Sequence, residues 1–156
     1  MNVRNLLLQY WDFSMDQEDW YPPLADVLKE VTLEQALWKP EKGAANSIWE
    51  NVQHLLYFKE RLLRRLTDPS YQPEEIGNDD TFRIPEASER AWREVKDRLA
   101  EVHASLHEKL EQLPEDEVDE KPQRFMSLIT HDAYHTGQIV LLSKLQGSWP
   151  AKRSFL

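Results

Sequence analysis

The sequence contains no cysteine among its 156 residues. Disulfide bonds, thiolate metal sites and cysteine nucleophiles are therefore excluded. Long apolar runs are missing too: the N-terminal run is three leucines, and no stretch approaches the ~20 apolar residues that a membrane span needs. We therefore expect a cytoplasmic protein with no signal peptide and no membrane partner.

Basic residues are scarce compared with acidic ones. There are 19 Lys and Arg against 28 Asp and Glu, so the formal net charge is −9. Nucleic-acid binding depends on clustered basic side chains, and we expect no nucleic-acid partner. The densest basic cluster is Arg61, Arg64 and Arg65, which we interpret as a solvated helix face because acidic residues share the segment.

Glycine is rare, with four residues, and few segments alternate between apolar and polar residues. Strong helix formers dominate instead, which indicates an all-α fold. The length suits one domain over residues 1–156, and six Trp, five Tyr and five Phe supply large areas for burial. We predict a four-helix bundle with a broken first helix and a long loop between the second and third helices.

The first half of the chain carries the clearest helix boundaries. The first helix is predicted over 3–16, is interrupted at two prolines and restarts over 24–31, with a short turn after Thr32. The second helix is predicted over 48–67. Ser47 is a suitable N-cap for it, and Glu50 stands at the reciprocal capping-box position.

The second half begins with a long loop over 69–84, which is rich in Pro, Asn and Asp. Loops of this length are often functional, although a plain surface crossover is an equal alternative. A third helix is predicted from 85 or 86 to 113, followed by an acidic linker over 115–120. The fourth helix is predicted over 122–146 and ends at a glycine.

Two pairs of histidines have the i, i+4 spacing that places two rings on one helix face. His103 and His107 lie beside the apolar stripe of the third helix, and we expect them to be exposed or half-exposed. His131 and His135 instead share the direction of core residues such as Ile139. Burying an unpartnered polar group costs about 1–3 kcal/mol, so these two rings need partners, and a shared metal ion is one solution. The alternative is an ordinary core histidine bonded to a carbonyl.

His54 lies at the edge of the apolar stripe of the second helix and could supply a third ligand. The alternative is a flanking histidine held by Asn51 or Glu50. Three neutral imidazoles suit Zn²⁺, Ni²⁺, Co²⁺ or Fe²⁺, and three protein ligands leave a coordination position for water or substrate. Closure of that position by Asp12 or Glu50 would argue against catalysis.

Two segments resemble the DinB-like (YfiT-like) family of metalloenzymes. They are residues 46–55, NSIWENVQHL, and residues 131–139, HDAYHTGQI. The resemblance implies a four-helix bundle in which His54, His131 and His135 bind one divalent metal ion. Zn²⁺ and Ni²⁺ are the first candidates, and Co²⁺, Fe²⁺ and Mn²⁺ the others. It also implies that the histidine pair of the third helix does not bind metal.

The resemblance further implies a metal-dependent enzyme, either a thiol S-transferase or a hydrolase, whose partner is a small molecule such as a low-molecular-weight thiol. The alternative is a noncatalytic metal- or ligand-binding module of the same fold. We also expect a homodimer, because cyclic dimers are the commonest oligomers.

Three residues near the predicted ligands have less certain roles. For Tyr134 we favour core packing over an approach to the pocket. Asp132 is predicted to point to the other side of its helix, toward another segment. Gly137 costs about 1 kcal/mol relative to Ala inside a helix, and close helix packing beside the metal would account for it.

Overall fold

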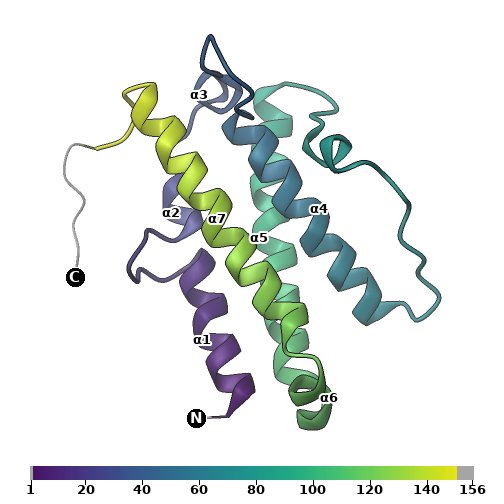
Figure 1. The fold of residues 1–156 in the computed structure, drawn as a ribbon. Coiled ribbons are helices and arrows are strands. Elements are labelled where there is room, and N and C mark those ends of the chain that lie inside the picture. The colour runs from purple at the N-terminus through teal and green to yellow at the C-terminus, as the bar shows by residue number, and fades with distance from the viewer. Residues whose placement is uncertain (1, 151–156) are drawn as a thin grey trace.

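The computed structural model describes residues 2–150, and helices are the only regular secondary structure in that part of the chain (Figure 1). This confirms the predicted all-α fold. The elements are α1 (Val3–Met15), α2 (Leu24–Leu28), α3 (Leu33–Leu37), α4 (Ile48–Thr67), the 3₁₀ helix η1 (Asn78–Phe82), α5 (Glu89–Gln112), α6 (Glu115–Glu120) and α7 (Gln123–Leu145).

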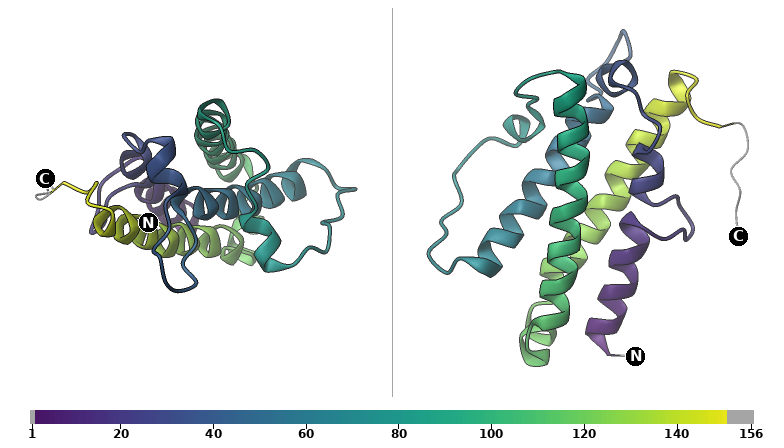
Figure 2. Two further views of the ribbon diagram at one scale, coloured as in Figure 1. Left: turned by 90° about the horizontal axis from the view of Figure 1, so that it is seen from above. Right: turned by 180° about the vertical axis from the view of Figure 1, so that it is seen from behind.

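The four long helices form the bundle. Helix α4 packs against α5 and α7, and α1 packs against the same two helices, so each long helix has two long neighbours (Figures 1 and 2). The short helices α2 and α3 follow α1 and pack against the bundle, which confirms the broken first helix. Among the described residues, no helix combines the length and apolar character needed to cross a membrane.

Local capping signals set several helix ends where the sequence predicted them. The Ser47 hydroxyl accepts a hydrogen bond from the Glu50 backbone N–H, and the Glu50 carboxylate accepts one from the Ser47 backbone N–H. Thr32 and Gln35 form a second capping box at α3. Gly147, with φ of +76°, follows α7 in the left-handed conformation that favours glycine.

Three predicted element bounds were wrong. Helix α2 ends at Leu28 rather than at 31. Helix α5 begins at Glu89 rather than at 85 or 86, because the Ser88 hydroxyl caps it by accepting from the Ala91 N–H. The acidic linker over 115–120 is the helix α6. Three acidic residues in its first turn stabilise this helix by interacting with the positive, N-terminal end of the helix dipole. The buried side chain of Val118 packs it against the bundle.

The explanation offered for Gly137 was also wrong. A Cβ atom at this position would meet no atom within 4 Å, so no close packing requires the glycine. Residue 137 lies on an exposed part of α7, and nothing in the structure accounts for its identity.

Candidate metal centre

Three histidines from two neighbouring helices meet on one side of the bundle. His54 projects from α4, and His131 and His135 project from α7 one turn apart. Their candidate ligand atoms all lie within 4.8 Å of one another, and the Nε2 atoms of His54 and His131 are 2.9 Å apart. His54 and His135 are buried and His131 is half-buried. The structure thus brings together the three residues that the sequence singled out, in a group that could hold a metal ion.

The hydrogen bonds behind two of the rings determine which nitrogen faces the centre. The Thr81 hydroxyl donates its one hydrogen to the Asn78 carbonyl (2.6 Å). Its oxygen must therefore accept the hydrogen bond from His54 Nδ1–H (2.5 Å). The Asn51 amide nitrogen donates to the Ser47 carbonyl (2.8 Å), so its oxygen accepts from His135 Nδ1–H (2.7 Å). Each proton on Nδ1 leaves a lone pair on Nε2, which is what a metal ligand requires.

The hydrogen-bond partner of Asn51 is His135, not His54 as the sequence analysis considered. Asn51 holds His135 across the helix interface instead of His54 on its own helix. Glu50 does not hold His54 either, because its carboxylate caps α4 and contacts Lys39 Nζ at 2.6–2.7 Å.

Two phenylalanine rings, one from η1 and one from α4, pack against the clustered histidines. Phe82 of η1 stacks on the His54 ring with centroids 3.9 Å apart, and Phe58 packs edge-on against both His54 and His131. The loop between α4 and α5 thus supplies both Thr81 and Phe82 to the surroundings of His54. This favours the functional interpretation of the loop over a plain crossover.

Burial keeps the three imidazoles neutral. It lowers the pKa of His54 from 6.5 to about 4, with a smaller effect from His131. It lowers the pKa of His135 to about 3, with contributions from both neighbouring histidines. The pKa of His131 is also lowered by burial, against the opposing effect of Asp132. At neutral pH the rings therefore offer lone pairs without first losing a proton.

The centre opens onto a cleft of about 420 Å³. We call it the histidine cleft; it is lined by His54, Phe58, Asn78, Ser127, Leu128, Thr130, His131 and Tyr134. Tyr134 is 67% exposed at this cleft, so its predicted core packing was wrong. Neither acidic residue considered as a closing ligand reaches the centre: Asp12 contacts His107 Nε2 at 3.4 Å, and Glu50 caps α4.

The model of the DinB superfamily matches residues 22–139. The chain belongs to the DinB superfamily. No curated protein and no solved structure gives a significant match. The matched segment of this DinB-superfamily chain runs from just before α2 into α7 and includes all three clustered histidines.

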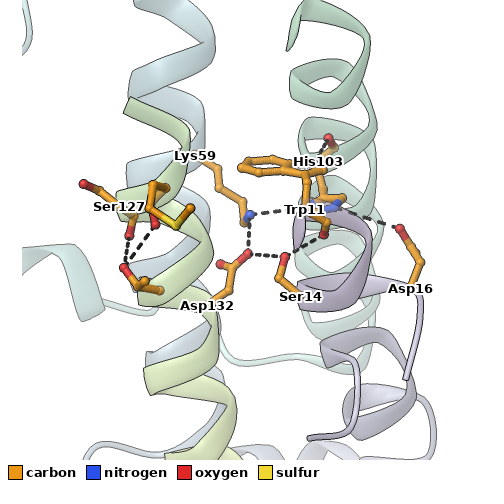
Figure 3. Close-up of polar contacts among 9 residues, drawn as sticks. Trp11, Ser14, Asp16, Lys59, His103, Ser127 and Asp132 are labelled. Atoms are coloured by element: carbon orange, nitrogen blue, oxygen red, sulfur yellow. Dashed lines mark hydrogen bonds and ion pairs between the residues drawn. The ribbon is translucent and has the colours of Figure 1, made fainter. Parts of the chain in front are cut away.

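The other histidine pair behaves differently from the prediction at one position. His107 is half-exposed as predicted, but His103 is buried, with 3% of its surface exposed. The reason is a buried polar cluster between α1, α4, α5 and α7 (Figure 3). Within it, His103 stacks on Trp11 with centroids 4.5 Å apart, and its Nδ1 lies 3.1 Å from Lys59 Nζ.

Lys59 and Asp132 form the ion pair at the middle of this cluster. The Lys59 side chain is fully buried, and its Nζ lies 2.7 Å from Asp132 Oδ2 and 4.2 Å from the centroid of the Trp11 ring. The Ser14 hydroxyl contacts the same carboxylate oxygen at 3.0 Å. Asp132 thus faces another segment, as its helix position predicted, while its neighbour His131 faces the centre.

Of the two residues that position the ligands, sequence reasoning gave Asn51 the wrong partner and missed Thr81. Asn51 lies one turn before His54, so helix spacing alone placed it near the centre but could not show that it faces α7. Thr81 lies in the aperiodic loop, where no spacing pattern indicates a direction. Lys59 was missed as well, because a lysine at an apolar helix position is usually solvated at its tip.

Proposed function

We propose that this chain is a metal-dependent enzyme that acts on a small molecule, with His54, His131 and His135 as ligands of one divalent ion. The observation that supports it is the hydrogen-bond arrangement: separate acceptors hold the Nδ1 protons of two rings and direct their Nε2 lone pairs inward. A single core histidine needs only one partner, whereas three convergent imidazoles match the ligand set of catalytic zinc.

The metals that suit this donor set are Zn²⁺ and Ni²⁺ first, since neutral imidazole is a good ligand for both. When bound, such an ion supplies Lewis acidity, which makes water or a thiol a stronger nucleophile near neutral pH. Thr81 and Asn51 orient the histidine rings, and Phe82 covers one face of the His54 ring. The histidine cleft, whose lining includes Phe58, leaves the centre accessible to substrate.

The accessible cleft also distinguishes an enzyme from a noncatalytic metal-binding module. A noncatalytic module that only stores metal is best served by a closed set of four ligands. Here the carboxylates considered as a fourth ligand are engaged elsewhere, which supports an enzyme. A thiol S-transferase and a hydrolase both remain compatible with this arrangement, and the transferase version draws its support from the family.

Metal content tests the first part of the proposal. The purified protein should contain up to one equivalent of a first-row metal, measured by inorganic mass spectrometry. His54→Ala, His131→Ala and His135→Ala should each lower affinity by more than about 100-fold, since loss even of an outer hydrogen-bond partner costs 10–100-fold. His107→Ala is the matched control, because this half-exposed ring has the same i, i+4 spacing. Retention of metal in all three ligand variants would refute the site.

Turnover tests the second part. The Zn²⁺- or Ni²⁺-loaded protein is assayed with a generic electrophile and a panel of low-molecular-weight thiols that includes bacillithiol, and separately with activated esters and amides. A rate above the metal-free control that disappears in His135→Ala supports an enzyme and identifies its class. If no thiol gives a rate above that control, the transferase version is wrong.

A further inference from the structure

A second cleft, of about 680 Å³, adjoins the histidine cleft. It shares Phe58, Ser127 and Leu128 with that cleft, so the two clefts lie next to each other along α4 and α7. Its remaining lining combines apolar Leu62 and Leu66 with five charged residues. We call it the basic cleft, after Arg61, Arg65, Lys121 and Arg124, which outnumber its one acidic residue, Glu117.

The charges in the basic cleft are not balanced. Glu117 pairs with Arg124, with Oε1 and Nη1 3.1 Å apart. Within the described part of the chain, Arg61, Arg65 and Lys121 have no ion-pair partner, and the Nε atom of Arg61 is buried without a hydrogen-bond partner. In a chain of net charge −9, this concentration of unpaired positive charge is a local exception.

The helix register places these charges at a defined separation from the histidines. Arg61 follows His54 by seven residues on α4, and Arg124 precedes His131 by seven on α7. Seven residues make almost two full turns, so each arginine lies on the same helix face as its histidine and about 10 Å along the axis. The helices are antiparallel, since Asn51 meets His135 while His54 meets His131. Arg61 and Arg124 therefore lie toward the same end of the bundle, each about 10 Å from its histidine along the helix axis.

We propose that the basic cleft binds the oxyanion of an elongated small molecule, a carboxylate or a phosphate, whose other end reaches the three histidines. This inference rests on the proposed function for the role of the histidines, but not for the anion site itself. Arginine and lysine bind such oxyanions through charge-assisted hydrogen bonds, and the apolar residues between the two ends cover the linking atoms. A solvated helix face does not account for Arg61, whose Nε is buried; Arg64, which does not line the cleft, fits that description.

The anion site is tested first on the metal-free protein, by titration with adipate and with inorganic phosphate in NMR or calorimetry. The tighter of the two probes identifies the head group. Arg61→Gln should weaken binding about tenfold, as expected for one charge-assisted hydrogen bond, and Lys121→Gln should weaken it measurably. Arg64→Gln removes the same charge one turn away and should change affinity less than about twofold.

Three outcomes would overturn the anion site. They are no binding of either probe, equal losses in Arg61→Gln and Arg64→Gln, and a preference for a DNA or RNA oligonucleotide over both probes. Thermal melts of each variant establish that it is folded. Lys121 is exposed, so its variant keeps the test decisive if Arg61→Gln is unstable.

The span between the two ends is tested on the Co²⁺-loaded protein with mercaptoalkanoates of increasing length, followed by the thiolate-to-cobalt absorption band. With bonds of about 1.5 Å, the eight-carbon acid spans about 10 Å and should bind at least tenfold more tightly than the eight-carbon mercaptoalcohol. Arg61→Gln should abolish this difference. Equal binding of acid and alcohol would refute the inference while leaving the metal site intact. Failure to bind Co²⁺ would refute the proposed function while leaving the anion titration decisive.

Discussion

Replacement of Asn51 by leucine is the sharpest test of how the protein holds its ligands. The buried Asn51 side chain accepts the Nδ1–H of His135 at 2.7 Å across the α4–α7 interface. Without that acceptor the ring can rotate, and its proton can move to Nε2, where it competes with metal. Outer partners of this kind contribute 10–100-fold to metal affinity, or about 1.4–2.8 kcal/mol.

The assay is a competition titration of Zn²⁺ between the metal-free protein and a fluorescent chelator. Asn51→Leu should bind 10–100-fold more weakly, whereas Asn51→Asp should retain most of the affinity, because a carboxylate also accepts from Nδ1–H. Gln53→Leu is the matched control: its amide donates to the Arg83 carbonyl at 3.3 Å, and within residues 2–150 it forms no hydrogen bond to the three histidines. Urea unfolding runs in parallel, because Asn51→Leu also loses the bond to Ser47, worth about 1 kcal/mol. Unchanged affinity in folded Asn51→Leu would show that His135 does not bind metal through Nε2.

Three further predictions follow from the same contacts. Thr81→Val removes the acceptor for His54 Nδ1–H and should weaken Zn²⁺ binding about tenfold in the chelator assay; wild-type affinity would show that the loop does not orient the ring. Lys59→Met leaves Asp132 buried without its cation and should cost about 3–5 kcal/mol in urea unfolding, while the double variant Lys59→Met/Asp132→Leu recovers most of the loss; a cost below 1 kcal/mol would contradict this account. In the metal-free protein, burial lowers the pKa values of His54, His103 and His135, so the unfolded chain takes up protons that the folded chain does not. The free energy of unfolding should therefore be highest above pH 6.5 and fall as the pH drops toward 4, by up to about 1.4 kcal/mol per pH unit for each group. Equal free energies of unfolding at pH 7 and pH 5 would argue against buried neutral rings.

The sequence predicted what depends on local spacing. Ser47 and Glu50 are three residues apart, and their capping box forms through contacts within one turn. The i, i+4 spacing of His131 and His135 places both rings on one face because α7 is regular there. These features need no knowledge of neighbouring helices.

Features that depend on contacts between helices were not predicted. The burial of His103 follows from Trp11 and Lys59, which lie on two other helices. The exposure of Tyr134 follows from which side of α7 faces the cleft. Thr81 reaches His54 through an irregular loop, whose course no periodic pattern describes.

The buried polar cluster joins α1 to residues far along the sequence, which affects the order in which the fold can form. Trp11 Nε1 donates to the carbonyl of His103, 92 residues later, and the Ser14 hydroxyl reaches Asp132, 118 residues later. These contacts of α1 therefore cannot form until α5 and α7 have been synthesised, and contacts so distant in the sequence are slow to close. His131 and His135 belong to the same late segment as Asp132. Burial of the Lys59 charge and assembly of the three-histidine centre thus become complete in one step, when α7 is synthesised and docks.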